Sequence, residues 1–345
     1  MSPLPPDHTP LVQVRTPTYR RPAMLRRCLQ SLQAQTWSNW VCDVQDDSPD
    51  SACEAVVRAL GDPRIHYRRN EPRLYASKNI DSCFSRKNPR NADYFCLVED
   101  DNWLLPEFMR ANIELARREG VEVVLRNQLV ELGSGTEEAR LSAFGILDGK
   151  FVEGRYDPGL FRLALMADIG MSHGGLFWSR KATSDFEIGF PVSATLQEYM
   201  RTYAVEEPIY VALEPLAVWA ENGEDTTRNL GARVGYLRRE LTLKRSIAAL
   251  QRRAWQRATP EDREGFLTSP RFRYAKADRA RGMVKSLTRL AVGDALPAKE
   301  HARLVLRGAM IRVLGRVEPG LQAFFEAREA EERGFAAHGV EARGV

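Results

Sequence analysis

Three consecutive acidic residues, Glu99, Asp100 and Asp101, follow the apolar segment 94–98. Carboxylates this close together repel one another and lose hydration at the end of a buried strand, so a cation or a bound ligand is expected to offset the cost. Hard oxygen ligands of this kind suit Mg²⁺ or Mn²⁺. The competing interpretation is structural, with the acids capping a helix that begins near Pro106.

A second acidic pair, Asp46 and Asp47, ends another apolar segment, "WVCDVQDD". Between residues 11 and 119 such segments alternate with stretches that carry apolar residues at helical spacing. This alternation is typical of an α/β fold, a mostly parallel sheet with helices on its faces. Ligands of such sheets bind outside the carboxyl ends of the strands. The pattern therefore predicts that both acidic clusters lie on the same rim of one sheet.

The composition is that of a globular protein, with 345 residues of which 43% are hydrophobic. A chain of this size buries a substantial core, and we expect one large domain with an accessory region. No apolar run approaches the roughly 20 residues that span a bilayer, and residues 1–14 lack the pattern of a signal peptide, so the expected location is cytoplasmic. The five cysteines have no metal-binding spacing and are expected to be reduced, mostly buried thiols.

Charge is distributed unevenly along the chain. Residues 1–227 contain 25 Lys and Arg against 33 Asp and Glu, residues 228–290 contain 17 against 5, and residues 291–345 contain 8 against 8. The shift in composition predicts a domain boundary near residue 228, with a basic helical region over 228–345.

The basic region carries apolar residues at helical spacing, and these need a surface to cover them. We expect the region to pack on the first domain or to form a homo-oligomer. The cations of residues 228–290 also suit an anionic membrane surface, which would hold the protein peripherally at the inner face of the membrane. Nucleic-acid binding is the weakest interpretation, because the segment contains no recognition motif.

The order of these motifs resembles a known family. The opening "VRTPTYRRPAMLRRCLQSLQAQTWSNWVCDVQDDSPD", the loop "RLYASKN" and the acidic motif "EDDNWLLPEF" are similar to family-2 glycosyltransferases of the GT-A fold. The resemblance is good over about residues 11–110 and thinner up to 227. It implies a GT-A domain over 1–227, with a Rossmann-like, mixed but mostly parallel sheet, followed by a helical appendage over 228–345.

The resemblance also implies an activity, inverting transfer of a sugar from a nucleoside-diphosphate sugar to an acceptor hydroxyl. In that family the last acid of the motif is a metal ligand and the one before it lies near the ribose or the metal, so Asp101 and Asp100 take these roles. A bound Mn²⁺ or Mg²⁺ would neutralise the charge on the departing diphosphate. Glu99 stands where Asp is more usual, and its role is left open.

Residues of the first turn and of the second strand end are expected to bind the nucleoside. Pro17, Thr18 and Tyr19 form the turn, and Tyr19 offers its ring to the base. Asp47 can accept the imide N–H of uracil or thymine, which favours UDP or dTDP donors. The structural alternatives are that Tyr19 fills the core and that Asp47 caps the helix over 50–60.

Two cations of the "RLYASKN" loop are suited to the phosphates of the donor. Arg73 and Lys78 lie near the predicted rim, where their side chains can reach phosphate oxygens. The alternative is that both are solvated surface charges, the usual state of these residue types.

An inverting transfer needs a carboxylate to accept the proton of the attacking hydroxyl. The resembled family has an acid at the head of a helix after a Gly-Gly segment, and Glu198 in "LQEYM" is the candidate here. A helix N-terminus would keep this carboxylate ionised. The competing acids are Asp185, Glu187, Glu206 and Glu207. A lone His173 before the Gly-Gly segment fits a phosphate or acceptor contact as well as a structural role.

The alternative from a different class is a catalytically degenerate GT-A domain that serves as a nucleotide- or carbohydrate-binding scaffold. The sequence leaves the donor sugar, the linkage and the acceptor open. The acceptor could be a glycan, a lipid-linked sugar, a natural product or a protein hydroxyl.

Overall fold

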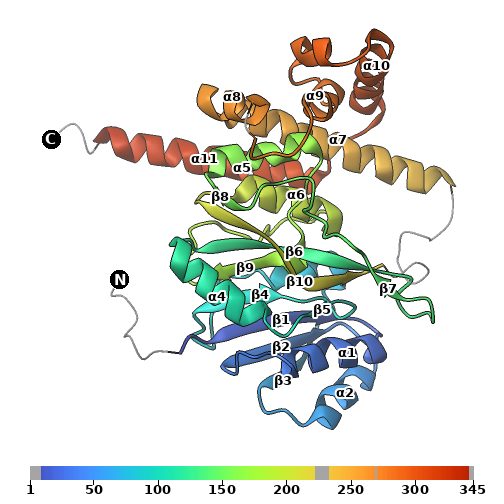
Figure 1. The fold of residues 1–345 in the computed structure, drawn as a ribbon, viewed down its shortest axis with the longest axis vertical. Coiled ribbons are helices and arrows are strands. Elements are labelled where there is room, and N and C mark those ends of the chain that lie inside the picture. Colours follow the sequence, from blue (N-terminus) through green and yellow to red (C-terminus); the bar gives the residue numbers. More distant parts are fainter. Residues whose placement is uncertain (1–8, 222–232, 269, 342–345) are drawn as a thin grey trace.

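The sheet domain is built around one ten-stranded sheet. The computed structural model describes residues 9–221, 233–268 and 270–341, and its main strand order is β3-β2-β1-β4-β9-β6-β10-β5 (Figure 1). The strands are β1 (Val12–Thr18), β2 (Trp40–Asp46), β3 (Ile65–Arg69), β4 (Tyr94–Leu97), β5 (Trp103–Leu104), β6 (Val123–Leu132), β7 (Arg140–Leu141), β8 (Gly154–Tyr156), β9 (Leu176–Ser179) and β10 (Ile209–Ala220). β1 pairs in parallel with β2 and β4, and β9 runs antiparallel between β4 and β6.

Helices cover both faces of this sheet. In the sheet domain they are α1 (Pro22–Gln33), α2 (Ala52–Leu60), α3 (Tyr75–Ser82), α4 (Phe108–Glu119), α5 (Pro158–Arg162) and α6 (Ala194–Ala204), with short 3₁₀ turns η1 (Leu163–Ala167) and η2 (His173–Gly175). α1 shows why these elements form: Pro22 opens the first turn, where its missing N–H costs nothing, and Leu25, Leu29 and Leu32 bury one face.

Two apolar cores lie on the two sides of the sheet. One joins α1, α2 and α4 to the sheet through residues such as Leu29, Val56 and Phe108. The other contains Phe84 and Leu163. Since helices lie on both sides, β1 is buried along its whole length. The predicted α/β architecture is confirmed.

The C-terminal region is helical, as predicted. Its elements are α7 (Arg233–Arg257), α8 (Pro260–Thr268), α9 (Lys276–Lys285), η4 (Leu290–Ala295), α10 (Ala298–Leu314) and α11 (Pro319–Glu341). They gather at one end of the molecule, beyond β8 and α6 (Figure 1). The predicted boundary between 227 and 228 lies outside the described residues, so the division of the chain there stays a prediction.

The C-terminal helices pack on the sheet domain. Leu196 and Met200 of α6 share a core with Leu250 of α7 and with Leu321 and Phe324 of α11. A further contact is made by Phe272, which lies in an aromatic cluster with Phe151 and Tyr156. Burial of these rings couples the two regions into one body.

Not every predicted apolar stripe is covered. Leu250 of α7 is fully buried, whereas Leu237 near the start of the same helix is exposed, because that end of α7 extends away from the body (Figure 1). All five cysteines are buried and free of disulfides. None of the helices in the described ranges combines the length and the apolar content that a membrane crossing requires.

Candidate functional site

The two acidic clusters meet at one rim of the sheet, as predicted. Asp47 follows β2 and Asp100 follows β4, and both strands pair with β1, which lies between them. The backbone N–H of Asp47 donates to the carbonyl oxygen of Thr18 at 3.0 Å. The carboxyl ends of three parallel strands therefore bring the two acidic clusters to one edge.

Asp100 and Asp101 share one arginine. The buried Asp100 accepts from the Thr18 hydroxyl at 2.7 Å and from the Tyr19 N–H at 3.3 Å. Arg21 Nη1 lies 3.3 Å from Asp100 Oδ1 and 2.7 Å from Asp101 Oδ2. Burial, with the neighbouring Asp101, raises the pKa of Asp100 to about 7. The two carboxylates thus share the Arg21 guanidinium, and their mutual repulsion favours the protonated form of the buried Asp100.

The interpretation that these acids cap a helix is wrong. α4 begins at Phe108 rather than near Pro106, its N-cap is Glu107, and no side chain bonds to the cap. The unpredicted strand β5 separates the acids from α4. Glu99 accepts from Asn102 Nδ2 at 3.2 Å, and its Oε1 lies 3.9 Å from Nδ1 of His173.

A divalent cation fits this rim only if other ligands complete its shell. Within the described residues, no group of three or more His, Cys, Asp or Glu side chains is arranged to hold a metal. Asp100 and Asp101 offer two carboxylates, which matches the way Mg²⁺ is usually held, by one or two carboxylates together with substrate phosphates and water. Arg21 now takes the place of a cation beside them and would have to share the pair with a metal.

Asp47 has one satisfied and one orphaned carboxylate oxygen. Oδ1 accepts from Asn70 Nδ2 at 2.9 Å and from the Leu74 N–H at 3.1 Å, whereas the buried Oδ2 has no hydrogen-bond partner. The N-cap of α2 is Ser51, so the interpretation that Asp47 caps this helix is wrong. A buried acceptor without a donor is costly, and its presence at the rim points to a donor supplied by a ligand.

The residues predicted to bind the nucleoside and the phosphates differ in burial and in their contacts within the protein. The Arg73 guanidinium carbon lies 4.1 Å from the ring centroid of the half-buried Tyr19, so this ring sits at the rim under a cation and does not fill the core. Arg73 itself is exposed, and so is Lys78 in α3. Pro17 lies within β1, at the register position opposite Gln45.

Glu198 lies on the neighbouring wall, in α6. It sits in the second turn of the helix rather than at its head, so the helix dipole acts on its carboxylate less than predicted. The side chain is half-buried, and a Cβ added to Gly170 would lie 3.0 Å from that of Glu198, so Gly170 and α6 are in close contact. The backbone oxygen of Glu198 accepts from the Met171 N–H at 3.2 Å, which ties α6 to the segment before η2.

A buried arginine that sequence reasoning missed connects this wall to the rim. Arg201 is fully buried and donates to Asp81 at 2.6 Å, to the Phe186 carbonyl at 2.8 Å, and contacts His173 Nε2 at 2.8 Å. Burial and Arg201 together lower the pKa of His173 to about 4, so this imidazole is neutral near pH 7. His173 is thus bonded within the protein, and Arg201 cross-links α3, α6 and η2.

The glycines before β9 have a packing role. A Cβ added to Gly175 would lie 2.4 Å from the Arg126 carbonyl oxygen, so only glycine allows η2 to approach β6 this closely.

Most acids that compete with Glu198 have other partners. Glu206 is bound by Arg162, Arg257 and Arg328. Glu207 accepts the backbone N–H groups of residues 183 and 184. Asp185 and Glu187 are exposed. Besides Arg201, sequence reasoning missed Arg21 and Asn70; the run "YRRP" before α1 was the available signal for Arg21.

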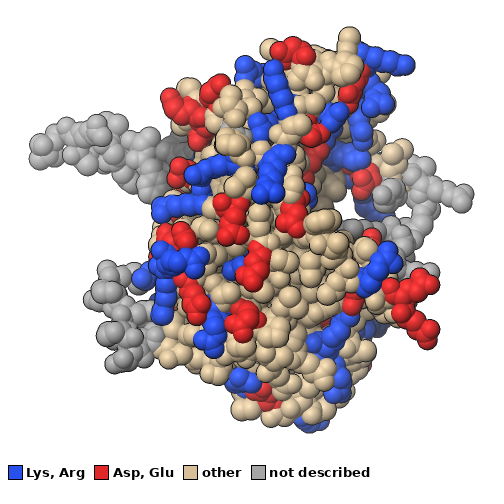
Figure 2. Space-filling view, viewed as in Figure 1, with Lys and Arg blue, Asp and Glu red and all other residues tan. Residues whose placement is uncertain are grey.

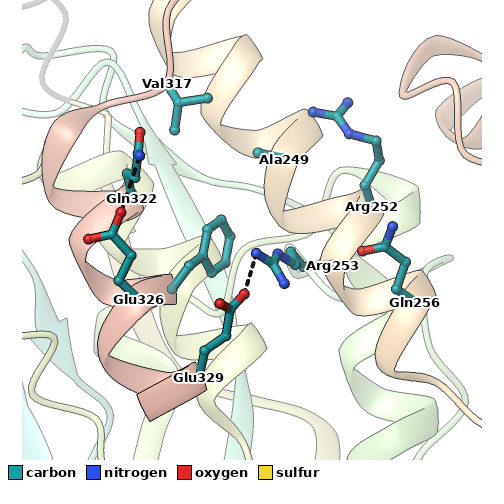
Figure 3. A pocket seen from close by; sticks show the side chains of 9 residues that line it. Ala249, Arg252, Arg253, Gln256, Val317, Gln322, Glu326 and Glu329 are labelled. Atoms are coloured by element: carbon teal, nitrogen blue, oxygen red, sulfur yellow. Dashed lines mark hydrogen bonds and ion pairs between the residues drawn. The ribbon is translucent and has the colours of Figure 1, made fainter.

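The molecule also contains a groove that is separate from the rim. It has a volume of about 400 Å³ and lies between α7 and α11. Arg253 and Glu329 form an ion pair across it, as the dashed line in Figure 3 shows. The groove contains none of the predicted site residues.

Comparisons with known proteins point to one family of enzymes. Residues 14–183 match the family described as Glycosyl transferase family 2. An uncharacterized protein of Mycobacterium tuberculosis (strain CDC 1551 / Oshkosh) is 34% identical over 97 residues, covering 28% of this chain and 30% of that protein. The putative colanic acid biosynthesis glycosyl transferase WcaA of Escherichia coli (strain K12) is 28% identical over 117 residues, covering 32% of this chain and 39% of WcaA.

A solved structure shows the same fold over almost the whole chain. Residues 1–349 of S. aureus TarS, in complex with UDP-GlcNAc, align with a TM-score of 0.57 at 12% identity, covering 94% of this chain and 92% of that one. Residues 14–183 of the chain thus belong to glycosyl transferase family 2, and the chain has a GT-A fold. The chain matches only about a third of the length of each of the two sequence relatives.

Proposed function

We propose that the protein is an inverting, metal-dependent glycosyltransferase that uses a donor with a uracil or thymine base. The observation that carries the proposal is the orphaned, buried oxygen of Asp47, which lies at the same rim as the acid pair Asp100 and Asp101. An acceptor for an imide N–H and a place for a cation are what a UDP or dTDP sugar requires. TarS, which has the same fold, is solved with UDP-GlcNAc bound.

In this proposal the chain holds the nucleoside at one end of the rim and the diphosphate at the other. Asp47 Oδ2 accepts the imide N–H, and Tyr19, backed by Arg73, contacts the base. Asp100 and Asp101 are the residues that would hold Mn²⁺ or Mg²⁺. A bound divalent ion supplies neutralisation of the charge that develops on the departing diphosphate. Lys78 is exposed on α3, and we propose that it reaches phosphate oxygens of the donor.

Glu198 is proposed as the general base. It accepts the proton of the acceptor hydroxyl as that oxygen attacks the anomeric carbon, on the side opposite the leaving diphosphate. Support comes from its half-buried place on α6, from the close contact of Gly170 beside it, and from the structural roles of Glu206 and Glu207.

The substitution Glu198→Gln tests the base directly. It should lower the rate of transfer by about 10²–10⁴, the usual cost of losing a general base, while donor binding stays unchanged. Glu187→Gln, which neutralises an exposed acid nearby in the chain, is the matched control and should keep full turnover. Near-normal turnover of Glu198→Gln would assign the proton transfer to another acid.

Donor and metal are tested together by thermal stabilisation with UDP, dTDP and GDP, with Mn²⁺ or with EDTA. We expect uracil and thymine nucleotides to stabilise the chain, and the metal to strengthen that effect in the native protein but not in Asp101→Asn. Stabilisation that ignores EDTA would argue against a metal at this rim. The scaffold alternative predicts the same binding without any transfer or donor hydrolysis.

A further inference from the structure

The outer face of α10 carries an apolar stripe that nothing in the described structure covers. Leu306 is 62% exposed, Met310 50%, Val313 79% and Leu314 60%. These residues recur at helical spacing, so they form one continuous stripe on the helix. Isolated apolar residues are normal on a surface, but a contiguous stripe of four large ones marks an interaction surface.

The opposite face of α10 explains why the stripe must point outward. Leu304 and Ile311 are buried, and a Cβ added to Gly308 would lie 2.2 Å from the carbonyl oxygen of Lys285 in α9. This contact seats α10 directly on α9 and fixes its rotation. The exposed stripe is therefore set by close backbone packing on the other side of the helix.

The charges around the stripe have one sign. Lys299, Arg303 and Arg307 are exposed on α10 and form no ion pair within the described part of the chain. The only acid in the helix is Glu300, which is bound by Arg281 at 2.9 Å. The outward face of α10 is thus apolar toward its C-terminal half and cationic toward its N-terminal half, without a carboxylate.

A second group of cations lies where α10 meets α7. Burial, followed by the charges of the nearby Arg245 and Arg312, lowers the pKa of Arg252 to about 10. Within the described chain none of the three forms an ion pair, and the buried Nη1 of Arg245 has no hydrogen-bond partner. A Cβ added to Gly315 would lie 2.8 Å from that of Arg245, which places the end of α10 against this group. Lys and Arg side chains are visible over these C-terminal helices in Figure 2.

We propose that the outer face of α10 docks on an anionic phospholipid membrane. Leu306, Met310, Val313 and Leu314 enter the interface, and Lys299, Arg303 and Arg307 contact the phosphates of the headgroups. An amphipathic helix that lies in the plane of the interface combines these two features. A second copy of the chain fits this face less well, because the same face of a second molecule offers no carboxylate to the cations.

This inference moves the predicted membrane contact. The sequence indicated residues 228–290, but in the structure several apolar residues of that segment, such as Leu250 and Met283, lie in the cores, and Leu237 and Leu290 are exposed singly. The uncovered surface belongs to the following helix. The inference does not depend on the donor, the metal or the base.

The test is co-sedimentation of the full chain with vesicles. We expect binding to vesicles of phosphatidylglycerol and phosphatidylcholine, weaker at high salt, and little binding to phosphatidylcholine alone. Val313→Asp and Leu306→Asp should each lower the affinity at least tenfold, and Arg303→Glu roughly tenfold, since each basic residue contributes to attraction at an anionic surface. These side chains are exposed, so the fold should persist, as circular dichroism can verify.

Matched controls separate docking from general changes in surface character. Phe144→Asp alters another apolar side chain, 75% exposed, and Arg140→Glu alters an exposed cation on β7; both should bind as the native chain does. Equal losses in the controls, or undiminished binding of Val313→Asp, would overturn the proposal. So would a native dimer in lipid-free sedimentation velocity that Val313→Asp converts to monomer, because the stripe would then be covered by a second copy.

Discussion

The rim of the sheet and the junction with the C-terminal helices use the same residue types in opposite proportions. At the rim, Asp100 and Asp101 share Arg21. At the junction, three arginines, Arg162, Arg257 and Arg328, bind the single Glu206. Two neighbouring carboxylates offer oxygen ligands to an external cation, whereas three arginines around one acid hold two regions together. The acid-rich cluster is therefore the one we expect to carry function.

A third cluster is balanced in charge. Arg201 and Asp81 are both buried and form an ion pair with each other. Asp81 also accepts the backbone N–H groups of Ile188 and Gly189 at 2.9 and 2.8 Å. Removing one partner of such a pair leaves the other buried with its charge, which is the costliest way to break an ion pair.

The largest expected effect comes from this buried pair. Arg201→Met should lower the free energy of unfolding by roughly 3–5 kcal/mol, because Asp81 keeps its charge without a counter-ion. Urea denaturation followed by fluorescence measures the change. Arg90→Met is the matched control, since Arg90 pairs with the more exposed Asp43, and it should cost at most about 1 kcal/mol. Equal losses in the two variants would mean that burial does not distinguish them.

The next largest effect distinguishes two neighbouring acids at the rim, Asp46 and Asp47. Asp47→Asn should weaken UDP binding by about 10–100-fold, which corresponds to the roughly 1.5–3 kcal/mol of a hydrogen bond to a charged group. Titration calorimetry with UDP measures it. Asp46→Asn is the contrasting variant, because both oxygens of Asp46 already accept from Ser48 and Tyr67 within the protein.

Asp46→Asn should therefore lower the free energy of unfolding more than Asp47→Asn does. If Asp47→Asn binds UDP as tightly as the native protein, its orphaned oxygen does not face the base. A GDP preference in the native chain would lead to the same conclusion.

The acid pair should also make stability depend on pH. The pKa of Asp100 is raised to about 7 by burial and by Asp101, whereas an unfolded aspartate titrates near about 4. Between these values the folded chain holds a proton that the unfolded chain has lost. The contribution of Asp100 to the free energy of unfolding therefore falls as the pH rises through this window, by at most about 1.4 kcal/mol per pH unit.

Urea denaturation in EDTA at a series of pH values measures that slope. Asp100→Asn should remove this contribution, and Asp50→Asn, which changes an exposed aspartate, should keep it. The lowered pKa of His173 makes stability rise with pH between about 4 and 6.5, so the check is the difference between variant and native protein. If the stability of Asp100→Asn does not rise more steeply with pH than that of the native chain, the expected sign is contradicted.

The rim was predictable from the sequence because parallel strands end on the same side. Asp47 and Asp100 are separated by many residues, but each follows an apolar segment, and the α/β pattern alone brings such ends together. The insertion of β9 between β4 and β6 was not predictable in this way, since strand pairing is non-local and one sequence gives no register.

The partners of the acids were also hidden in the sequence. The sequence alone suggests that Arg201 is a surface cation of a helix, because arginine is seldom fully buried. Only the packed structure shows that it is buried against Asp81 and His173. The helical period likewise indicated apolar stripes at Leu237 and Val313, but it could not say which would be covered. Coverage depends on how α7 and α10 dock, which is a tertiary property.

The smallest expected effect tests the redundancy of the junction. Arg257→Gln leaves Glu206 bound by Arg162 and Arg328, so the free energy of unfolding should change by only about 0–1 kcal/mol, as for other partly exposed ion pairs. Glu206→Gln removes the shared acceptor of all three arginines and should cost more than Arg257→Gln in the same urea titration. If Arg257→Gln alone destabilises the chain as much as Glu206→Gln, the three arginines are not interchangeable. The contrast between an arginine-rich junction and an acid-rich rim would then lose its basis.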